Sequence, residues 1–270
     1  MRKAASSGSA LHLPSRFWEQ ARGSSHRLLV LDYDGTLAPF RVARDEAWPL
    51  PRTVAHLEAI AATRGTGVAV ISGRPLDELI RFLGTLPILL VGEHGWEMRC
   101  PDGRTAQHPL PAGAGDSLRR AMEAAEAAGL GPFLERKRTA VVLHTRGMPG
   151  PRALEMERTC RLLWEGKLAE GLARITSMDG GLEFRAAGRD KGTALRELLD
   201  ESDPGAFAVY IGDDSTDEDA FRELRNRGFG IRVGPPGPTS LARGWIESCE
   251  AMGEFLQRWQ AVLNEGSSGG

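Results

Sequence analysis

The sequence predicts an α/β protein: a parallel sheet with crossover helices, into which a smaller α+β unit is inserted. Short apolar runs alternate with longer segments that have the spacing of amphipathic helices, which is typical of a parallel sheet with right-handed crossovers. In the middle of the chain the alternation changes, because two helix-like segments there accompany runs typical of antiparallel strands. The 270 residues are enough for one large domain or two modest ones.

Four continuous apolar runs are expected to form parallel strands that are buried on both faces. In chain order these runs are residues 28–31, 68–71, 88–91 and 207–211. Helical spacing of apolar side chains predicts a helix over residues 51–64. Pro75 is suited to the start of a second helix, and a third is expected over residues 191–200.

The inserted unit is expected to pack two helices against antiparallel strands. Its predicted elements are a helix over 117–128, strands over 133–137 and 139–144, a helix over 151–164, and a hairpin of residues 172–177 and 182–185. The hairpin turn would be Asp179-Gly180-Gly181, a glycine-rich sequence typical of such turns.

These elements predict the domain limits. The parallel-sheet core is expected to comprise residues 26–107 and 188–265, and the inserted unit residues 108–187. Residues 1–25 and 266–270 are expected to be a flexible arm and a flexible tail, as chain ends without an evident packing pattern often are.

Composition excludes several classes of function. The 34 Lys and Arg residues nearly balance 36 Asp and Glu residues, so nucleic acid is not an expected partner. Three isolated cysteines argue against a disulfide framework or a cysteine zinc site. No apolar run has the length of a membrane span, and the first residues lack the apolar segment of a secretory signal. We therefore expect a cytoplasmic protein without a membrane partner.

Polar side chains follow each predicted parallel strand at its carboxyl end. Ligands of open parallel sheets bind beyond that edge, so we expect these side chains to meet in one crevice. They are Asp32 and Asp34, Ser72, Glu93 and His94, and Asp213 and Asp214.

Asp32 and Asp34 are the first candidate catalytic pair. Two carboxyl groups two residues apart, directly after a buried strand, fit a nucleophile beside an acid/base group. An Asx-rich turn is the structural alternative. A calcium loop is excluded because Thr36 and Leu37 stand where an acidic residue and a glycine are required.

Asp213 and Asp214 are candidate Mg²⁺ ligands, since short oxygen-bearing side chains suit that ion. The acidic residues after them, 217–219, are expected to be only the start of a helix, because Ser215 and Glu218 have the spacing of a capping box. Lys191 is unusual at a helix N-terminus, where a cation costs about 0.3–1 kcal/mol. A neighbouring anion, either phosphate or the carboxylate cluster, would offset that cost.

A family resemblance follows from these motifs. Asp32-Tyr33-Asp34-Gly35-Thr36-Leu37, Ser72, Lys191 and Gly212-Asp213-Asp214 resemble, in order, the four motifs of the haloacid-dehalogenase-like (HAD) phosphohydrolases. The resemblance implies a Rossmann-like core with the inserted unit as a C2-type cap. Further matches point to the trehalose-6-phosphate phosphatase family: Ile71 to Pro75, Gly92 to Gly95, Glu135 to Lys137, and Gly212 to Phe221.

The resemblance also implies roles for the crevice residues. Asp32 is the implied nucleophile, which forms an aspartyl-phosphate, and Asp34 the implied acid/base. Ser72 and Lys191 would hold the phosphoryl oxygens. Mg²⁺ is the implied cofactor, bound by Asp32, the Asp34 backbone carbonyl, Asp213 and Asp214.

The implied substrate is a sugar phosphate bound partly by the cap. The residues expected to contact it are Glu135, Lys137 and Glu183 from the cap and Arg74, Glu93 and His94 from the core. A solvated charged face is the alternative for residues 135–138, although strand alternation would place Glu135 and Lys137 on one side.

The functional alternatives are a phosphatase for sucrose phosphate or a glycosyl-glycerate phosphate, a phosphomutase, and a catalytically inactive regulatory module. The resemblance further implies functional pairing with a trehalose-phosphate synthase.

Overall fold

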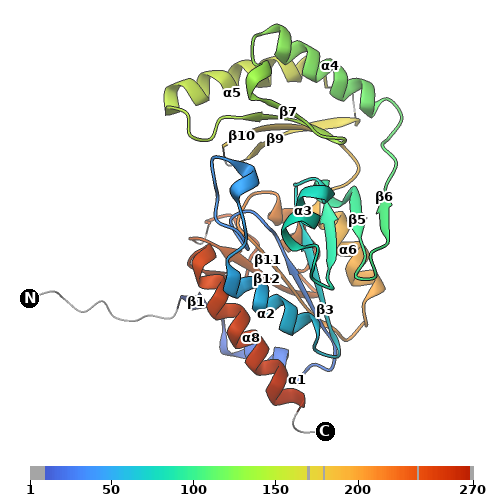
Figure 1. Ribbon diagram of the computed structural model, residues 1–270, viewed down its shortest axis with the longest axis vertical. Coiled ribbons are helices and arrows are strands. Elements are labelled where there is room, and N and C mark those ends of the chain that lie inside the picture. The colour runs from blue at the N-terminus through green and yellow to red at the C-terminus, as the bar shows by residue number, and fades with distance from the viewer. Residues whose placement is uncertain (1–9, 169–170, 179, 236, 268–270) are drawn as a thin grey trace, which may run out of the picture.

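The computed structural model describes residues 10–168, 171–178, 180–235 and 237–267. Two sheets organise this part of the chain. The larger has nine strands in the order β1-β13-β12-β11-β2-β3-β4-β5-β6, and the smaller has four in the order β7-β8-β10-β9. Figure 1 shows the small sheet and its helices at one end of the large sheet. The predicted α/β core with an α+β insertion is confirmed.

The centre of the large sheet is parallel. It contains β2 (Arg27–Leu31), β3 (Thr66–Ile71), β4 (Leu89–Gly92), β11 (Phe207–Gly212), β12 (Gly228–Val233) and β13 (Gly244–Ile246). The four predicted strands are among them. Because β2 lies between β11 and β3, the chain segments that follow these three strands emerge side by side at one edge of the sheet.

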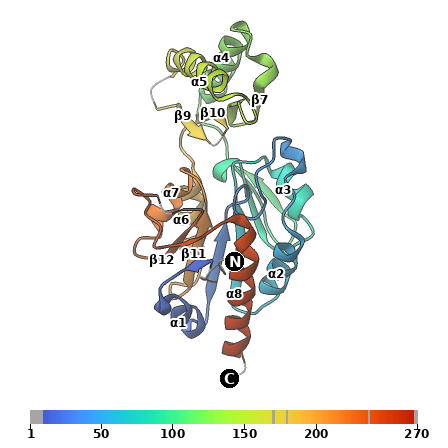
Figure 2. The same ribbon diagram turned by 90° about the vertical axis from the view of Figure 1, so that its left-hand side faces the viewer.

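Helices cover both faces of this sheet (Figure 2). One face packs against α1 (Ser15–Gly23), α2 (Pro51–Ala61), α3 (Leu76–Leu83) and α8 (Met252–Ser267). The other packs against α6 (Lys191–Glu201) and α7 (Asp217–Glu223). None of the helices in the described ranges is both long and apolar enough to cross a membrane.

Short antiparallel strands complete the sheet. At one side β5 (Glu97–Arg99) pairs with β4, and β6 (Thr105–Gln107) pairs with β5. At the other, β1 (Leu11–His12) pairs with β13. Single turns of 3₁₀ helix occur at Arg44–Glu46, Glu93–Gly95, Gly131–Phe133 and Cys249–Ala251.

The prediction of a flexible arm over residues 1–25 is wrong for the part that the structure describes. Residues 11–12 form β1, and α1 buries Phe17, Trp18 and Ala21. Phe17 packs edge-on against Phe229, with ring centroids 4.9 Å apart. The apolar pattern of this helix is too short to stand out in the sequence, but its two aromatic rings anchor it to the core. Residues 1–9 lie outside the described part.

The predicted tail is also shorter than expected, because α8 continues through residues 266 and 267. The rest of that tail, residues 268–270, is outside the described ranges.

The second sheet is antiparallel and is formed by β7 (Leu134–Arg136), β8 (Ala140–His144), β9 (Ala173–Met178) and β10 (Gly181–Ala186). Helices α4 (Ala114–Ala127) and α5 (Gly150–Glu165) pack on it around Trp164 and Phe184. The predicted hairpin is confirmed, although its turn residue Asp179 lies outside the described part. The domain limits at 108 and 187 stay a prediction.

Candidate active site

A cavity of about 380 Å³ lies between the carboxyl edge of the large sheet and the small sheet. Ten of the residues predicted for the site line it: Asp32, Asp34, Ser72, Arg74, His94, Lys137, Glu183, Lys191, Asp213 and Asp214. Glu93 and Glu135 are not among the described lining residues. The fold therefore brings together residues from both halves of the core and from the inserted unit.

Asp32 and Lys191 form a buried ion pair in this cavity. Asp32 directly follows β2, and its backbone N–H donates to the Ile211 carbonyl at 2.8 Å. Its Oδ1 lies 2.8 Å from Lys191 Nζ, which lies equally far from Asp217 Oδ1. Burial lowers the pKa of Lys191, but Asp217 and Asp32 raise it well above its ordinary value. The lysine is thus held charged. The sequence predicts an anion beside it, and in the structure Asp32 and Asp217 supply that negative charge.

Asp217 belongs to this cluster, so its interpretation as only the start of a helix is wrong. Its carboxylate is fully buried. Oδ1 accepts a 2.6 Å hydrogen bond from the Tyr210 hydroxyl, and Oδ2 accepts one of 2.9 Å from the Asp214 backbone. Gly212 permits this approach, because a Cβ there would lie 2.2 Å from Asp217 Cγ. That glycine, five residues before the aspartate, is the sequence signal that could have found it.

The predicted capping box is absent. The N-cap of α7 is Thr216, and it makes no side-chain capping bond. The Glu218 carboxylate instead accepts hydrogen bonds from Ser240 Oγ and the Leu241 backbone N–H at 2.6 and 2.8 Å. Glu218 therefore holds a loop of the core.

Three carboxylates could hold a metal ion. Asp32, Asp213 and Asp217 each offer an oxygen within 4.8 Å of the others. Asp213 Oδ1 is buried and has no hydrogen-bond partner among the described residues. Burial, followed by the charges of Asp32, Asp217 and Asp214, raises the pKa of Asp213 to about 10. A buried, unpartnered carboxylate oxygen beside other carboxylates fits a hard divalent cation such as Mg²⁺.

The other two predicted metal ligands direct their side chains elsewhere. Asp214 Oδ1 accepts hydrogen bonds from the backbone N–H and the hydroxyl of Thr216, at 2.6 and 2.7 Å. The Asp34 carboxylate accepts two bonds of 2.7 Å from the Arg74 guanidinium. A metal role for Asp34 through its backbone carbonyl and for Asp214 stays a prediction.

Arg74, predicted to bind substrate, is deeply buried and holds Asp34. The side chain of Arg74 is 2% exposed and that of Asp34 is 30% exposed. The guanidinium carbon lies 5.2 Å from the centre of the Tyr33 ring and 5.3 Å from that of Phe82. Its backbone N–H donates to Ser72 Oγ at 3.2 Å. A paired carboxylate, two rings and a serine therefore surround Arg74 and orient its guanidinium toward Asp34.

The inserted unit contributes Lys137 and Glu183 to the cavity. Glu183 lies 3.1 Å from His94 Nε2 and 3.4 Å from Lys137 Nζ, and Lys137 donates to the Gly73 carbonyl at 2.9 Å. Burial raises the pKa of Glu183, but His94 and Lys137 lower it well below its usual range. Glu183 thus links Lys137 of the inserted unit to His94 of the core at the wall of the cavity.

His94 reaches that triad through an unusual backbone. Its φ is +58° and that of Glu93 is +44°, in the left-handed region that residues with a Cβ rarely adopt. A Cβ at Gly73 would lie 2.6 Å from His94 Nε2, so glycine is required there. Such strain is often stored at functional sites.

Glu93 joins the core to the cap instead of facing the cavity. Its carboxylate accepts hydrogen bonds from the Thr139 backbone and hydroxyl and from the Arg138 backbone, the two backbone bonds being 2.7 and 3.2 Å. The predicted sugar contact of this residue stays a prediction. Its side chain anchors the start of β8.

Glu135 is ion-paired with Arg44, and its Oε2 lies 2.7 Å from His144 Nε2. Burial raises the pKa of Glu135, but the His144 hydrogen bond and the charges of Lys137 and Arg44 lower it to about 2. Arg44 itself lines the cavity. Sequence reasoning missed Arg44, because it lies in the long connection between β2 and α2, which carries no recognised motif.

Comparisons with known proteins identify the family of this chain. The family model for trehalose-phosphatase matches residues 30–236. A probable trehalose-phosphate phosphatase from Sinorhizobium fredii is 35% identical over 228 residues, which cover 83% of this chain and 84% of that protein. A bifunctional trehalose-6-phosphate synthase/phosphatase from Thermoproteus tenax is 34% identical over 236 residues, which cover 87% of this chain and 32% of that protein.

A solved structure shows the same fold. The C-terminal domain of trehalose-6-phosphate phosphatase from C. albicans superposes with a TM-score of 0.81 at 20% identity, covering 96% of this chain and 99% of that domain. The family match extends over both halves of the core and the insertion between them. The family expected from the sequence motifs is thereby confirmed, and the chain belongs to the trehalose-phosphatase family.

Proposed function

We propose that this protein is a Mg²⁺-dependent phosphatase that converts trehalose 6-phosphate to trehalose and phosphate. The observation that carries the proposal is the buried Asp32, which is paired with Lys191 and lies near the unpartnered Asp213 oxygen. Polar side chains of the cap line the same cavity. Family membership supports the substrate, since relatives in this family are named for it.

Asp32 is the nucleophile. A carboxylate oxygen of Asp32 bonds to phosphorus as the bond from phosphorus to the sugar oxygen breaks, and Asp34 gives its proton to that sugar oxygen. Asp34 then takes a proton from water as the water oxygen bonds to phosphorus and the bond from phosphorus to the Asp32 oxygen breaks, which releases phosphate and regenerates Asp32. Lys191 and Ser72 hold the phosphoryl oxygens during both steps.

Asp32 and Asp213 are the residues that would hold Mg²⁺, with Asp214 and the Asp34 carbonyl completing the predicted set. Bound there, the ion supplies the positive charge that lets an anionic carboxylate approach an anionic phosphate. Asp217 contributes indirectly, because it shares Lys191 with Asp32 and fixes the Asp214 backbone.

The cap supplies the sugar site. Lys137 and Glu183 of the cap and His94 of the core line the cavity and offer hydrogen-bonding groups for sugar hydroxyls. A site built to bind hydroxyls discriminates strongly against ligands that lack them. Glu135 contacts Arg44 and His144, which line this site. Glu93 holds the backbone at the start of β8.

Two further elements of the proposal concern the surroundings of the enzyme. A trehalose-phosphate synthase is the functional partner, and the naming of the Thermoproteus tenax relative as a bifunctional synthase/phosphatase supports this pairing. A cytoplasmic location is supported by the three cysteines, Cys100, Cys160 and Cys249, all of which are free.

Phosphate release from a panel of sugar phosphates with Mg²⁺ tests the substrate. We expect trehalose 6-phosphate to be turned over faster than sucrose phosphate or a glycosyl-glycerate phosphate. Fast turnover of another member, with little of trehalose 6-phosphate, would overturn the assignment.

Asp32→Asn tests the mechanism. We expect turnover to fall by several orders of magnitude with the fold retained, because an amide is a poor nucleophile. Chelation with EDTA should also abolish turnover, and added Mg²⁺ should restore it. Near-normal activity of Asp32→Asn would rule out the aspartyl-phosphate route, and a wild-type protein inactive on the whole panel would favour the regulatory module.

A further inference from the structure

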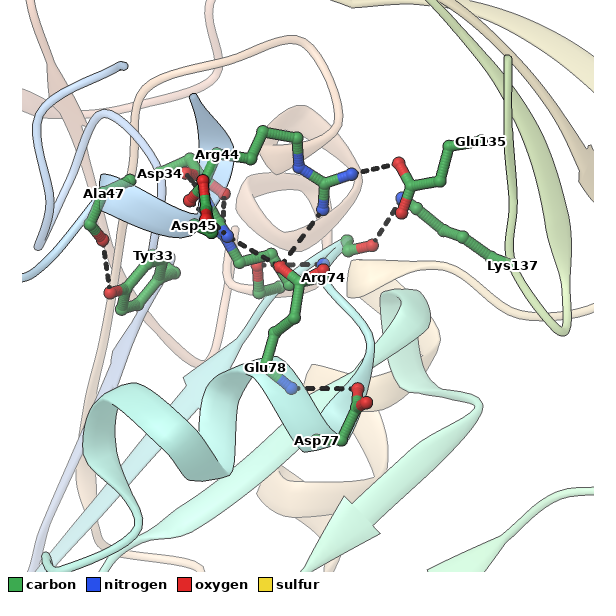
Figure 3. Close-up of polar contacts among 12 residues, drawn as sticks. Tyr33, Asp34, Arg44, Asp45, Ala47, Arg74, Asp77, Glu78, Glu135 and Lys137 are labelled. Carbon is green, nitrogen blue, oxygen red and sulfur yellow. Dashed lines mark hydrogen bonds and ion pairs between the residues drawn. The ribbon is translucent and has the colours of Figure 1, made fainter. Parts of the chain in front are cut away.

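Arg44 occupies a position between the core and the cap that the proposed chemistry does not yet use. It begins the 3₁₀ turn Arg44–Glu46 in the connection between β2 and α2. Figure 3 shows its guanidinium between Glu78, on α3, and Glu135, on β7 of the cap. Its side chain is 27% exposed and lines the cavity.

A continuous series of ion pairs runs through this residue. Arg44 Nη1 donates to Glu135 Oε2, and Arg44 Nη2 donates to Glu78 Oε2 at 3.3 Å. The same Glu78 oxygen accepts a 2.7 Å bond from Arg74 Nη1. Arg74 holds both oxygens of Asp34 with its other two nitrogens. Charges of alternating sign therefore connect the cap to the acid/base carboxyl.

The backbone of Arg44 strengthens this connection. Its carbonyl oxygen accepts a second bond from Arg74 Nη1, at 3.1 Å. Each nitrogen of the Arg74 guanidinium is thus engaged, by Asp34 on one side and by Glu78 and Arg44 on the other. The Arg44 backbone and the Glu78 carboxylate thus share one nitrogen of the guanidinium that holds Asp34.

The oxygens that join the series are shared. Glu135 Oε2 lies within hydrogen-bonding distance of both Arg44 and His144, and Glu78 Oε2 accepts from both arginines. A sugar hydroxyl that donated to Glu135 would compete with Arg44 there, and Arg44 would then rely more on Glu78. Because Glu78 shares that oxygen with Arg74, a stronger bond from Arg44 would weaken the bond from Arg74 and so change how Arg74 holds Asp34.

We propose that Arg44 is a positioning residue that couples occupation of the cap's sugar site to the placement of Asp34. This inference rests on the proposed function, since it assigns Asp34 as the acid/base and the cap as the sugar site. Protonation of the leaving oxygen then becomes efficient only when a sugar engages the cap, which favours sugar phosphates over other phosphate esters.

The test compares two substrates that differ in their need for Asp34 as an acid in the first step. It follows release of the leaving group in a single turnover, because hydrolysis of the aspartyl-phosphate uses Asp34 as a base with either substrate. Trehalose is a poor leaving group that contacts the cap, whereas p-nitrophenolate is stable without protonation and lacks the sugar. For Arg44→Ala we expect the rate of trehalose release to fall about 10- to 100-fold, up to the lower end of what general acid catalysis contributes, because Asp34 is displaced and not removed. The rate of p-nitrophenolate release should stay within about threefold of wild type, because that step does not use general acid assistance.

Arg81→Ala is the matched control. Arg81 donates to the Asp45 carbonyl of the same turn at 3.2 Å and lies 4.6 Å from the centre of the Phe82 ring, but it contacts neither Glu78 nor Glu135 in the described structure. Turnover of both substrates should be unchanged in this variant. Urea unfolding of both variants verifies that each is folded at the assay temperature.

Arg44→Lys separates bridging from charge. A lysine keeps the positive charge but lacks the fork that reaches two carboxylates, so it should not restore kcat on the sugar phosphate. In a double-mutant cycle, Arg44→Ala and Glu78→Gln should be strongly non-additive, because both residues belong to one series.

Three results would overturn the inference: equal loss of single-turnover leaving-group release on both substrates, no loss on either, or full activity of Arg44→Lys. Failure of the proposed function is distinguishable, because it would appear in the wild-type protein as turnover of p-nitrophenyl phosphate without turnover of trehalose 6-phosphate. The Arg44 comparison would then be repeated with whichever sugar phosphate the panel identifies.

Discussion

Gly35→Ala perturbs the candidate metal site without changing any charge. Gly35 has φ of +74°, and a Cβ there would lie 2.3 Å from Asp213 Oδ2 and 2.8 Å from Asp213 Oδ1, the unpartnered oxygen. Non-bonded heavy atoms pack at about 3.5 Å. The Asp213 carboxylate must therefore move by about 1 Å to accommodate the methyl group.

The expected effect has two separable parts. The left-handed backbone costs about 1–2 kcal/mol for a residue with a Cβ, which lowers the free energy of unfolding. The displaced carboxylate affects function, because Mg²⁺ requires near-octahedral ligands at about 2.0–2.1 Å. A misplacement of about 1 Å can cost about 100-fold in rate, so kcat/KM should fall at least that far at fixed Mg²⁺.

Gly103→Ala is the control for backbone strain. Gly103 has φ of +88° and no described atom within 4 Å of a Cβ placed there. Urea unfolding should show a similar loss of stability in both variants, while Mg²⁺ titration by calorimetry and turnover should be impaired only in Gly35→Ala. If Gly35→Ala binds Mg²⁺ and turns over substrate as Gly103→Ala does, Asp213 is not a metal ligand.

Two other predictions follow from the site. Because the pKa of Asp213 is raised to about 10, this group holds a proton at pH 7 in the metal-free protein. Mg²⁺ should therefore displace about one proton and bind more tightly as pH rises. Calorimetry in buffers of different ionisation enthalpy measures this proton release, and binding without proton release would show that the group was already ionised. Glu93→Gln should lower the free energy of unfolding by about 1–3 kcal/mol, because the NH₂ group of glutamine would face a backbone N–H donor, either of Arg138 or of Thr139. KM should change little. A raised KM at unchanged stability would instead identify Glu93 as a sugar ligand.

Much of the fold could be predicted because its strands carry strong local patterns. Strands buried on both faces are continuous apolar runs, and β2, β3, β4 and β11 all have one. Strand β12 has the sequence GFGIRV, in which glycines and an arginine interrupt the run, and β5 and β6 have three residues each. These elements are defined by their neighbours in the sheet and leave little periodicity to detect.

The site was predictable to the extent that sheet topology determines it. Parallel strands send Asp32, Ser72 and Asp213 to one edge whatever else surrounds them. Side-chain partners across the cavity were not predictable, because Arg44 and Glu135 are 91 positions apart and meet only through the orientation of the cap. Asp217 was misjudged because a helix start explains an acidic residue equally well until its burial is known.

The partner of each carboxylate, more than its residue type, decides what it can do here. Asp34, Glu135 and Glu183 each have a neighbouring cationic side chain, which fixes the orientation of the carboxylate. Asp32 shares the charge of Lys191 with Asp217, which leaves the nucleophile only partly neutralised. Asp213 alone among them has a buried oxygen without a described partner. A divalent cation is the ligand that would satisfy that oxygen and offset the remaining negative charge around Asp32. The positions of the lysine and arginine side chains thus indicate that the metal ion binds between Asp32 and Asp213.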